Sequence, residues 1–171
     1  MERFCTGDAG AFDALFKRHA APVRGYLWRL VRDAPLADDL TQTTFLSVTK
    51  ARGRFIKGAR FKPWLYAIAT NAARDVLRRR RELTTETGEV LTGENAKLEA
   101  VEPDRGLEKA VRAALLQLPD AQREAIELHR FGGLSFAEIA ESAGVTESAV
   151  KVRAHRGYER LRELLKGVWE K

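Results

Sequence analysis

The fold of this chain is decided from Leu134 to Leu165, where the sequence reads LSFAEIAESAGVTESAVKVRAHRGYERLRELL. Ser135 precedes Glu138 by three residues, which is the spacing of a capping box, so a helix is predicted to start there. Gly144 is free to adopt a positive φ where the chain turns, and Thr146 is placed to cap a second helix. The stretch therefore predicts a helix-turn-helix.

Apolar and small residues around the turn support the same prediction. Leu134 and Ile139 occupy the positions of a hydrophobic staple, which fixes how the chain enters the first helix. Ala140 is a small residue where two crossing helices must approach closely, and Val150 gives the second helix an apolar contact.

The second helix of the motif is basic. Its cations are Lys151, Arg153, Arg156, Arg160 and Arg162, with His155 among them, against Glu147, Glu159 and Glu163. A cationic helix after such a turn is typical of a recognition helix that enters the DNA major groove. The alternative is an ordinary helical hairpin with a solvated basic face.

Length and composition limit the protein to a small number of classes. With 171 residues and 44% hydrophobic content, the chain can form one domain or two small ones. It has no apolar run long enough to span a bilayer, and its start, MERFCTGDAGAF, lacks a signal-peptide core. We expect a soluble, cytoplasmic protein. Cys5, His19, His129 and His155 show no metal-ligand spacing, so no metal site or internal disulfide is expected.

The net charge of +6 is unevenly distributed along the chain. Residues 1–81 hold 17 Lys/Arg against 7 Asp/Glu, residues 82–106 hold 2 against 7, and residues 107–171 hold 11 against 10. Residues 82–106 are also free of aromatics and contain glycines and a proline. We therefore predict an all-α protein, in which a flexible acidic linker at 82–106 joins two small helical domains that contact polyanions, at 1–81 and 107–171.

The first basic block predicts several helices. Apolar residues follow helical spacing from Ala11 to Arg32, but Pro22 is expected to kink or divide that helix near Ala20 or Ala21. Asp33 and Pro35 mark a new helix that runs to about Lys50. Its apolar residues are Leu36, Leu40, Phe45 and Val48, which leave Asp39, Gln42 and Thr43 on a polar side.

A loop and a long helix complete this block. Residues 51–62 read ARGRFIKGARFK, and Pro63 then opens a helix whose predicted apolar face is Leu65, Ile68, Ala69, Ala72 and Val76. Its opposite side carries Asn71, Arg74, Arg78 and Arg81 in one stripe, with Trp64 near the edge. Cations beside an aromatic and a loop suit a protein that holds an unpaired base or single strand. The alternative is that Trp64, Phe55 and Phe61 pack the core.

The second block is predicted to form helices on either side of Pro119. The apolar residues before the proline are Leu107, Val111, Ala114, Leu115 and Leu118, and those after it are Ala125, Ile126, Leu128 and Phe131. Gly132 and Gly133 end the second of these helices.

Four segments together resemble an ECF-type bacterial sigma factor. They are DDLTQTTF at 38–45, FKPWLYAIATNAARDVLRRR at 61–80, the acidic linker, and LPDAQREAIELHRFGGLSFAEIAESAGVTESAVKVRAHRGYERLR at 118–162. The resemblance implies a dissociable specificity subunit of RNA polymerase whose two helical domains read the two upstream promoter elements. It implies no catalytic chemistry and no cofactor.

The resemblance also assigns roles to residues. Asp39 and Gln42, with Asp38 and Thr43, correspond to the family's contact with the polymerase clamp. The family usually has Glu where this chain has Thr43, so one anionic contact is either lost or moved to Asp38. The loop and the helix behind it correspond to the part that captures a flipped base of the −10 element, with Arg54, Phe55, Lys57, Arg60, Phe61, Trp64, Asn71, Arg74 and Arg78 as candidates. The helix after Thr146 corresponds to the reader of the −35 element, with Ser148, Lys151, His155 and Arg156 as candidates for bases and Arg153 and Arg160 for phosphates.

The expected partners are core RNA polymerase, through its clamp and flap regions, promoter DNA, and an anti-sigma factor. No small-molecule substrate and no membrane insertion are expected. Two alternatives from other classes remain open from the residues alone. One is a repressor or activator that uses only the helix-turn-helix, and the other is a recombinase or nuclease that the motif merely targets. The second would need a nucleophile or a cluster of carboxylates, and no such cluster is visible in the sequence.

Overall fold

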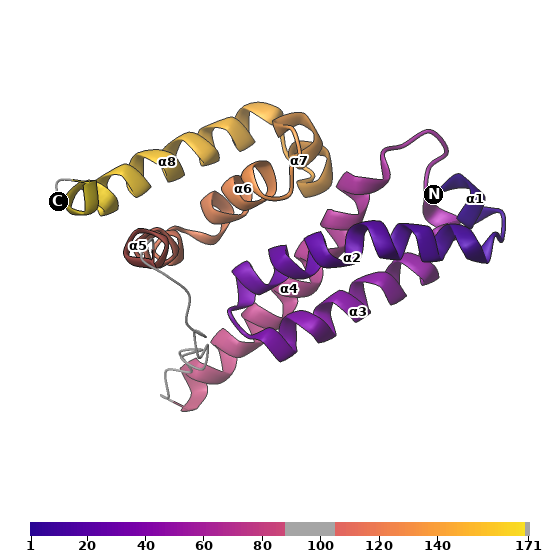
Figure 1. Ribbon diagram of the computed structural model, residues 1–171, viewed down its shortest axis with the longest axis horizontal. Helices are drawn as coiled ribbons and strands as arrows, with labels where there is room; N and C mark the ends of the chain where they lie inside the picture. Colours follow the sequence, from indigo (N-terminus) through magenta and orange to yellow (C-terminus); the bar gives the residue numbers. More distant parts are fainter. Residues whose placement is uncertain (88–104, 170–171) are drawn as a thin grey trace. The chain divides into compact units, whose positions relative to one another are not determined.

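The computed structural model describes residues 1–87 and 105–169, and all regular elements in these ranges are helices (Figure 1). The predicted all-α class is therefore confirmed. The chain divides into two compact units, Met1–Ala96 and Lys97–Lys171. Each unit is described separately below.

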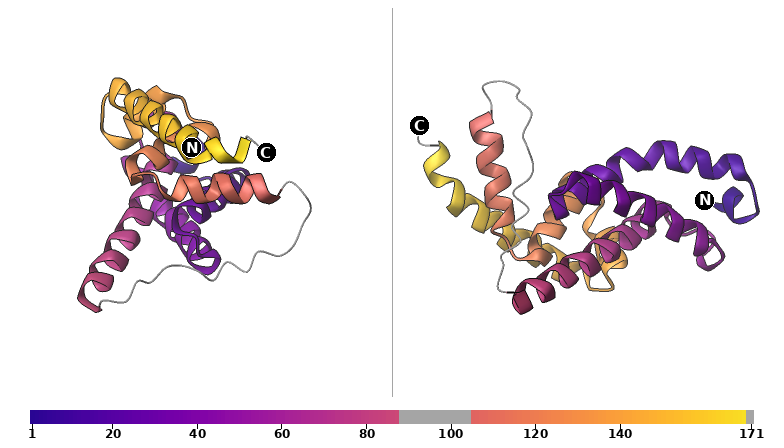
Figure 2. Two further views of the ribbon diagram at one scale, coloured as in Figure 1. Left: turned by 90° about the vertical axis from the view of Figure 1, so that its left-hand side faces the viewer. Right: turned by 90° about the horizontal axis from the view of Figure 1, so that it is seen from below.

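The first unit is built on three long helices that run side by side (Figures 1 and 2). A short helix and a 3₁₀ turn complete it at the end of the unit where the chain begins. The elements are α1 (Glu2–Cys5), α2 (Ala9–Val31), α3 (Ala34–Lys50), η1 (Arg52–Arg54) and α4 (Phe61–Thr87). Helix α4 thus starts two residues before Pro63 and continues through residues 82–87, which the sequence placed in the linker.

Helix α2 is continuous through Pro22. Of the two predicted outcomes, a kink or a division, the division was therefore wrong. A proline inside a helix costs about 3 kcal/mol, because it removes a hydrogen bond and crowds the preceding turn. Here Pro22 is exposed, and the residues that follow it, Val23, Tyr26 and Leu27, are fully buried. Fully burying each large apolar side chain contributes about 1.5–3 kcal/mol, which offsets the cost of the proline.

The turn between α2 and α3 is fixed by Asp33, as the sequence predicted. Its carboxylate accepts a hydrogen bond from the Leu36 backbone N–H at 2.9 Å and caps α3. The Arg80 guanidinium of α4 donates to the other oxygen at 2.8 Å. The hydrogen bond from Arg80, together with that from Leu36, holds the pKa of Asp33 below its usual value. One carboxylate therefore joins the start of α3 to α4.

The buried face of α4 is rotated from the predicted one. Leu65 and Ala69 are buried as expected, but Ile68, Ala72 and Val76 are only half-buried. Their place is taken by Tyr66, Thr70 and Ala73, which are all buried. The cause lies in α2, where Tyr26 packs its ring edge against Tyr66 and shares a 2.8 Å hydrogen bond with the Thr70 hydroxyl.

Over residues 105–169, the second unit contains four helices, with α8 packed against the other three (Figure 1). Its core holds Leu115, Leu118 and Ile126, and Val111 and Leu161 cover it. The elements are α5 (Arg105–Leu116), α6 (Asp120–Arg130), α7 (Phe136–Ala143) and α8 (Glu147–Trp169).

Phe131, which was predicted among the apolar contacts of α6, is exposed, whereas Ala125, Ile126 and Leu128 are buried. Phe131 follows the last residue of the helix as its C-cap, and 54% of it is exposed. The chain reverses there through Gly132 and Gly133: a Cβ on Gly132 would lie 2.5 Å from the Leu128 carbonyl oxygen, and Gly133 has a φ of 61°. Phe131 itself keeps helical backbone angles, and its N–H still bonds to the Glu127 carbonyl oxygen at 3.0 Å, so the chain leaves the helix only after it.

The helix-turn-helix is confirmed at each of its local signals. The Ser135 hydroxyl accepts from the Glu138 N–H at 3.2 Å, and the Glu138 carboxylate accepts from the Ser135 N–H at 2.8 Å. Gly144 ends α7 with a φ of 64°. The Thr146 hydroxyl then accepts from the Ala149 N–H at 3.2 Å in the first turn of α8.

Replacing Gly144 with Ala tests the conformational origin of the turn. A Cβ built at Gly144 meets nothing within 4 Å, so any loss of stability must come from the left-handed backbone. We expect Gly144→Ala to lower the free energy of unfolding by about 1 kcal/mol. The matched control is Gly106→Ala, which adds the same methyl group in open space within α5 and should be neutral or slightly stabilising. Native-state hydrogen exchange of α7 and α8 in the full-length protein measures both effects, and equal stability of the two variants would contradict the explanation.

Candidate nucleic-acid interface

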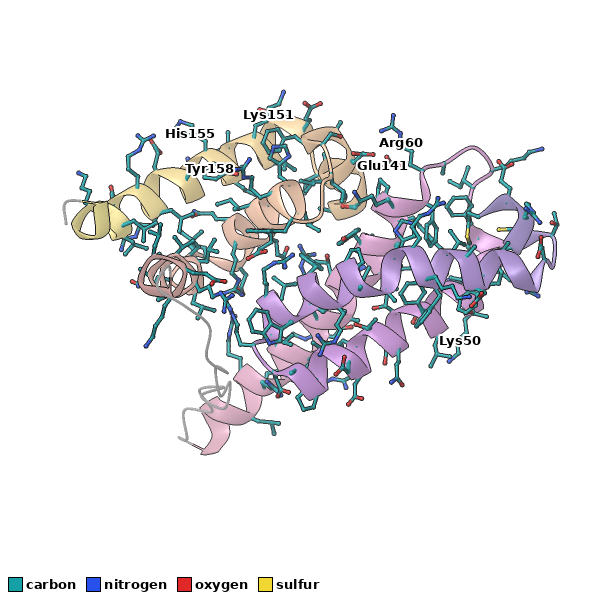
Figure 3. All side chains as sticks on the ribbon, viewed as in Figure 1. Lys50, Arg60, Glu141, Lys151, His155 and Tyr158 are labelled. Carbon is teal, nitrogen blue, oxygen red and sulfur yellow. The ribbon has the colours of Figure 1, made fainter. Side chains whose placement is uncertain are left out.

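One side of α3 carries the residues that the sequence assigned to polymerase. Asp39, Gln42 and Thr43 are exposed along it. Leu46 continues the same face one turn later and is 61% exposed, and Lys50 projects from the end of the helix (Figure 3). Sequence reasoning missed Leu46, although its spacing of four from Gln42 already placed it on this side.

Asp38 differs from its neighbour Asp39 because it already has a partner. Two nitrogens of the Arg24 guanidinium meet the two carboxylate oxygens of Asp38, the longer hydrogen bond measuring 3.2 Å. This pairing lowers the pKa of Asp38 and raises that of Arg24. Within the described ranges Asp39 has no ion-pair partner in the chain. Asp39 therefore offers a carboxylate to another molecule more readily than Asp38 does.

The loop between α3 and α4 presents cations around an apolar tip. Arg54, Lys57 and Arg60 are exposed, as predicted for residues that meet phosphates. Ile56 lies beside Lys57 and is 76% exposed. Because Ile56 lies next to Lys57 and Phe55 in the same loop, we add it to the candidate surface. Only its position in a polar loop marks it in the sequence.

Three aromatic rings anchor this loop to α4. Phe55 lies edge-on to Trp64 with centroids 5.2 Å apart, and Phe61 lies 6.4 Å from Phe55 and 6.2 Å from Trp64. All three rings are only half-buried. This arrangement is compatible with both predictions for these aromatics, packing in the core and binding of a base. The rings pack against one another and still keep part of their surface in solvent.

His19 of α2 closes the cluster on one side. Its ring lies edge-on to Phe61 at 5.3 Å. Burial, followed by the nearby charges of Arg18 and Lys62, lowers the pKa of His19. The imidazole therefore stays neutral at pH 7, and it adds aromatic surface to the cluster without adding charge.

The polar stripe of α4 extends away from these aromatics. Asn71, Arg74, Arg78 and Arg81 are all exposed, as the sequence predicted. Arg78 lies 3.3 Å from the Asp75 carboxylate and 3.9 Å from that of Glu82. Exposed pairs of this kind are weak, so a phosphate can replace the carboxylates at little cost.

The exposed side of α8 carries the other group of candidates. Ser148, Lys151, His155, Arg156 and Arg160 are exposed and Arg153 is half-buried. Lys151 and His155 lie on the side of α8 away from α6 (Figure 3). Three of these basic residues have acidic neighbours on the same helix, in the pairs Lys151–Glu147 at 2.7 Å, His155–Glu159 at 3.3 Å and Arg160–Glu163 at 2.9 Å.

Two residues at the centre of this side stand apart from those pairs. Arg156 has no ion-pair partner among the residues that the structure describes, so its guanidinium is available to a ligand. Val152 is 45% exposed and shares a face with Ser148 and His155. Sequence reasoning listed only polar residues here and missed Val152. An apolar side chain at this place can contact a thymine methyl group.

The described ranges hold no group of three or more His, Cys, Asp or Glu side chains that could bind a metal ion. None of their helices is both long enough and apolar enough to cross a bilayer.

Comparison with protein families matches both units. The family model described as Sigma-70 region 2 covers residues 15–82. The model described as Sigma-70, region 4 covers residues 108–161. The first match contains the α3 face, the loop and the stripe of α4, and the second contains the helix-turn-helix.

Individual relatives agree over nearly the whole chain. RNA polymerase sigma factor CarQ of Myxococcus xanthus is 47% identical over 165 residues, which are 96% of this chain and 95% of the relative. The ECF RNA polymerase sigma factor SigE of Mycolicibacterium smegmatis is 35% identical over 94% of this chain and 65% of its own length.

A solved structure has the same fold. It is the sigma factor RpoE in complex with the anti-sigma factor NepR from Bartonella quintana, which matches 91% of this chain and 97% of its own with a TM-score of 0.74 and 26% identity. Matches to both regions, in the expected order and over almost the full length of CarQ, determine the family. The chain belongs to the ECF branch of the sigma-70 family, and it is an RNA polymerase sigma factor that directs transcription initiation and performs no catalysis itself.

Proposed function

We propose that this sigma factor reads its promoter in two physical states, the −35 element as duplex and the −10 element as a melted strand. The observation that supports this division is the difference between the two cationic surfaces. The surface in the second unit lies on one regular helix, α8, whereas that in the first unit surrounds half-buried aromatic rings. A helix fits the major groove, and exposed rings stack on unpaired bases.

In the −35 complex, α8 enters the major groove with its exposed side toward the bases. Ser148, Lys151, His155 and Arg156 meet base edges, and Val152 meets a thymine methyl group. Arg153 and Arg160 meet phosphates, which position the helix without reading sequence. The acidic neighbours of Lys151 and His155 are released when DNA replaces them.

In the −10 complex, the loop at 51–62 receives a base extruded from the non-template strand. Extrusion costs a few kcal/mol of unstacking. Stacking on an aromatic side chain returns about 1–3 kcal/mol per base, and contacts from Asn71, Arg74 and Arg78 to the strand supply the rest. Phe55, Phe61 and Trp64 form the aromatic surface, and Arg54, Lys57 and Arg60 surround it. The process requires no ATP.

The α3 face binds the polymerase clamp. Asp39 and Gln42 supply the polar contacts, and Leu46 adds apolar area beside them. Thr43 stands where the family usually has Glu, and Asp38 does not replace that charge because Arg24 holds it. The second unit meets the flap region of the same core enzyme.

An inhibitor protein and a cytoplasmic location complete the proposal. RpoE of Bartonella quintana, which shares the fold, is held by an anti-sigma factor. We infer that an anti-sigma factor likewise covers the polymerase-binding and DNA-binding surfaces of this protein. Core polymerase and promoter DNA are both cytoplasmic, so the protein acts there.

Substitutions in α3 test the clamp contact. We expect Asp39→Ala and Gln42→Ala each to weaken binding to purified core polymerase about fivefold to thirtyfold, since each removes a contact made across the interface. Asp38→Ala is the matched control, because it removes the same charge from a carboxylate already paired with Arg24, and it should change the dissociation constant less than about threefold. Equal losses from Asp38→Ala and Asp39→Ala would contradict the assignment.

Arg156→Ala tests base reading by α8. If Arg156 contacts a guanine, the substitution costs about 1–3 kcal/mol on the preferred −35 sequence and relaxes preference at one base position. Binding of holoenzyme to a library randomised in the −35 element measures both effects. Arg160→Ala should instead lower binding uniformly across the library, as expected for a phosphate contact. A uniform loss from Arg156→Ala would make Arg156 a phosphate contact as well.

Trp64→Ala tests the melted-strand surface. We expect holoenzyme with this variant to bind the closed promoter normally and to open it more slowly, because the ring that supports the extruded base is lost. Permanganate reactivity of unpaired thymines follows opening on a promoter selected with wild-type holoenzyme. Trp64→Phe keeps an aromatic face and should restore most of the opening. Lower thermal stability with normal opening would mean that Trp64 only packs the core.

A further inference from the structure

Helix α1 lies against the loop that follows α3, although almost 50 residues separate them in sequence (Figure 1). No role was predicted for residues 2–5 from the sequence. Side chains from both ends of α1 nevertheless bond to the backbone of the loop.

The first contact is made by Glu2. Its carboxylate accepts a hydrogen bond from the Gly58 backbone N–H at 3.2 Å. Gly58 has a φ of 83°, and the Ala59 N–H bonds to the Ile56 carbonyl at 3.0 Å beside it. Glu2 thus holds the tight turn that displays Ile56 and Lys57.

The second contact is made by Cys5. Its thiol donates to the Arg52 carbonyl oxygen at 3.3 Å, and the same oxygen accepts from the Phe55 N–H at 3.3 Å. The Arg52 guanidinium lies 5.7 Å from the centre of the Phe4 ring. Cys5 and Phe4 therefore fix the start of the loop at η1.

Helix α1 is itself anchored to α2, so it can act as a support. Phe4 is 5% exposed and packs on Phe12 with ring centroids 5.1 Å apart. Arg3 forms an ion pair with Asp8, the N-cap of α2, at 2.7 Å. That N-cap bond to Ala11 and the pair with Arg3 hold the pKa of Asp8 below its usual value.

The loop is thereby held from two directions. Phe55 ties its middle to Phe61 and Trp64, and α1 ties its start and its turn to α2. Fixing the backbone of one residue costs about 1–2 kcal/mol of conformational entropy, so a loop with exposed cations and an exposed Ile56 needs such supports to keep one conformation.

We propose that α1 is a positioning element for the base-reading loop, in which Glu2 and Cys5 set the conformation of residues 52–58. The importance of that conformation for promoter opening rests on the proposed function of the loop. The hydrogen bonds from Glu2 and Cys5 are independent of that function. The effect of α1 on the loop and its effect on promoter opening are therefore tested separately.

Hydrogen exchange of the peptide covering residues 52–60 tests the support in the free full-length protein. We expect Glu2→Ala and Cys5→Ala each to speed its exchange about threefold to tenfold, which is the effect of losing one ordinary hydrogen bond. Glu2→Gln keeps an acceptor and Cys5→Ser keeps a donor, so both should restore most of the protection. Asp13→Ala is the matched control, because it removes an exposed carboxylate paired with Lys17 elsewhere on the same unit, and it should leave the loop unchanged.

Promoter opening supplies the second measurement. With the same variants bound to core polymerase, opening followed by permanganate should slow by a similar factor in both Ala variants and recover in Glu2→Gln and Cys5→Ser. Unchanged loop exchange in both Ala variants would overturn the proposal. Faster loop exchange with unchanged opening would overturn the role of α1 in opening. Failure of wild-type holoenzyme to open any promoter would refute the function of the loop, while the exchange data would still decide whether α1 supports it.

Discussion

Helices α4 and α8 must each bury one side and keep a row of cations in water on the other, because removing an unpaired charge from water costs far more than a helix gains by packing. Both helices meet this constraint with small residues. In α4, Ala69 and Ala73 are fully buried, and in α8, Ala154 is 2% exposed. A Cβ on Gly157 of α8 would lie 2.7 Å from the end of Ile126. These small residues let the buried side of each helix approach its neighbours closely, while the arginines on the other side stay in solvent.

The side of α4 that is buried depends on its contacts with α2. On α4 the interior is set by Tyr26 of α2, whose ring and hydroxyl meet Tyr66 and Thr70. Hydrophobic spacing alone favoured Ile68 and Val76 as buried residues. It gives no indication that the Thr70 hydroxyl can be buried because Tyr26 of another helix forms a hydrogen bond with it. The polar stripe was nevertheless predicted correctly, because it lies on the far side of the helix under either choice.

Local signals were read from the sequence with most success. The capping box at Ser135, the turn at Gly144 and the cap at Thr146 each depend on residues within four positions of one another, so their chemistry is complete in the sequence. The continuity of α2 at Pro22 depends on the burial of Val23 and Tyr26 against other helices. The spacing of apolar residues does not show how much free energy that burial contributes. For the same reason, the ion pair between Arg24 and Asp38, which joins two helices, was not predicted.

On the proposed function, the glutamates on α8 affect how the protein distributes itself over a genome. Lys151 and Arg160 each lie within one turn of a carboxylate that they would give up to bind DNA. A helix balanced in this way would gain less from counterion release on an arbitrary duplex than one without the glutamates. A genome offers about 10⁶–10⁹ competing sites, and residence on them would deplete the free factor. On the proposed function, the acidic residues of α8 would therefore leave more of the protein available to polymerase.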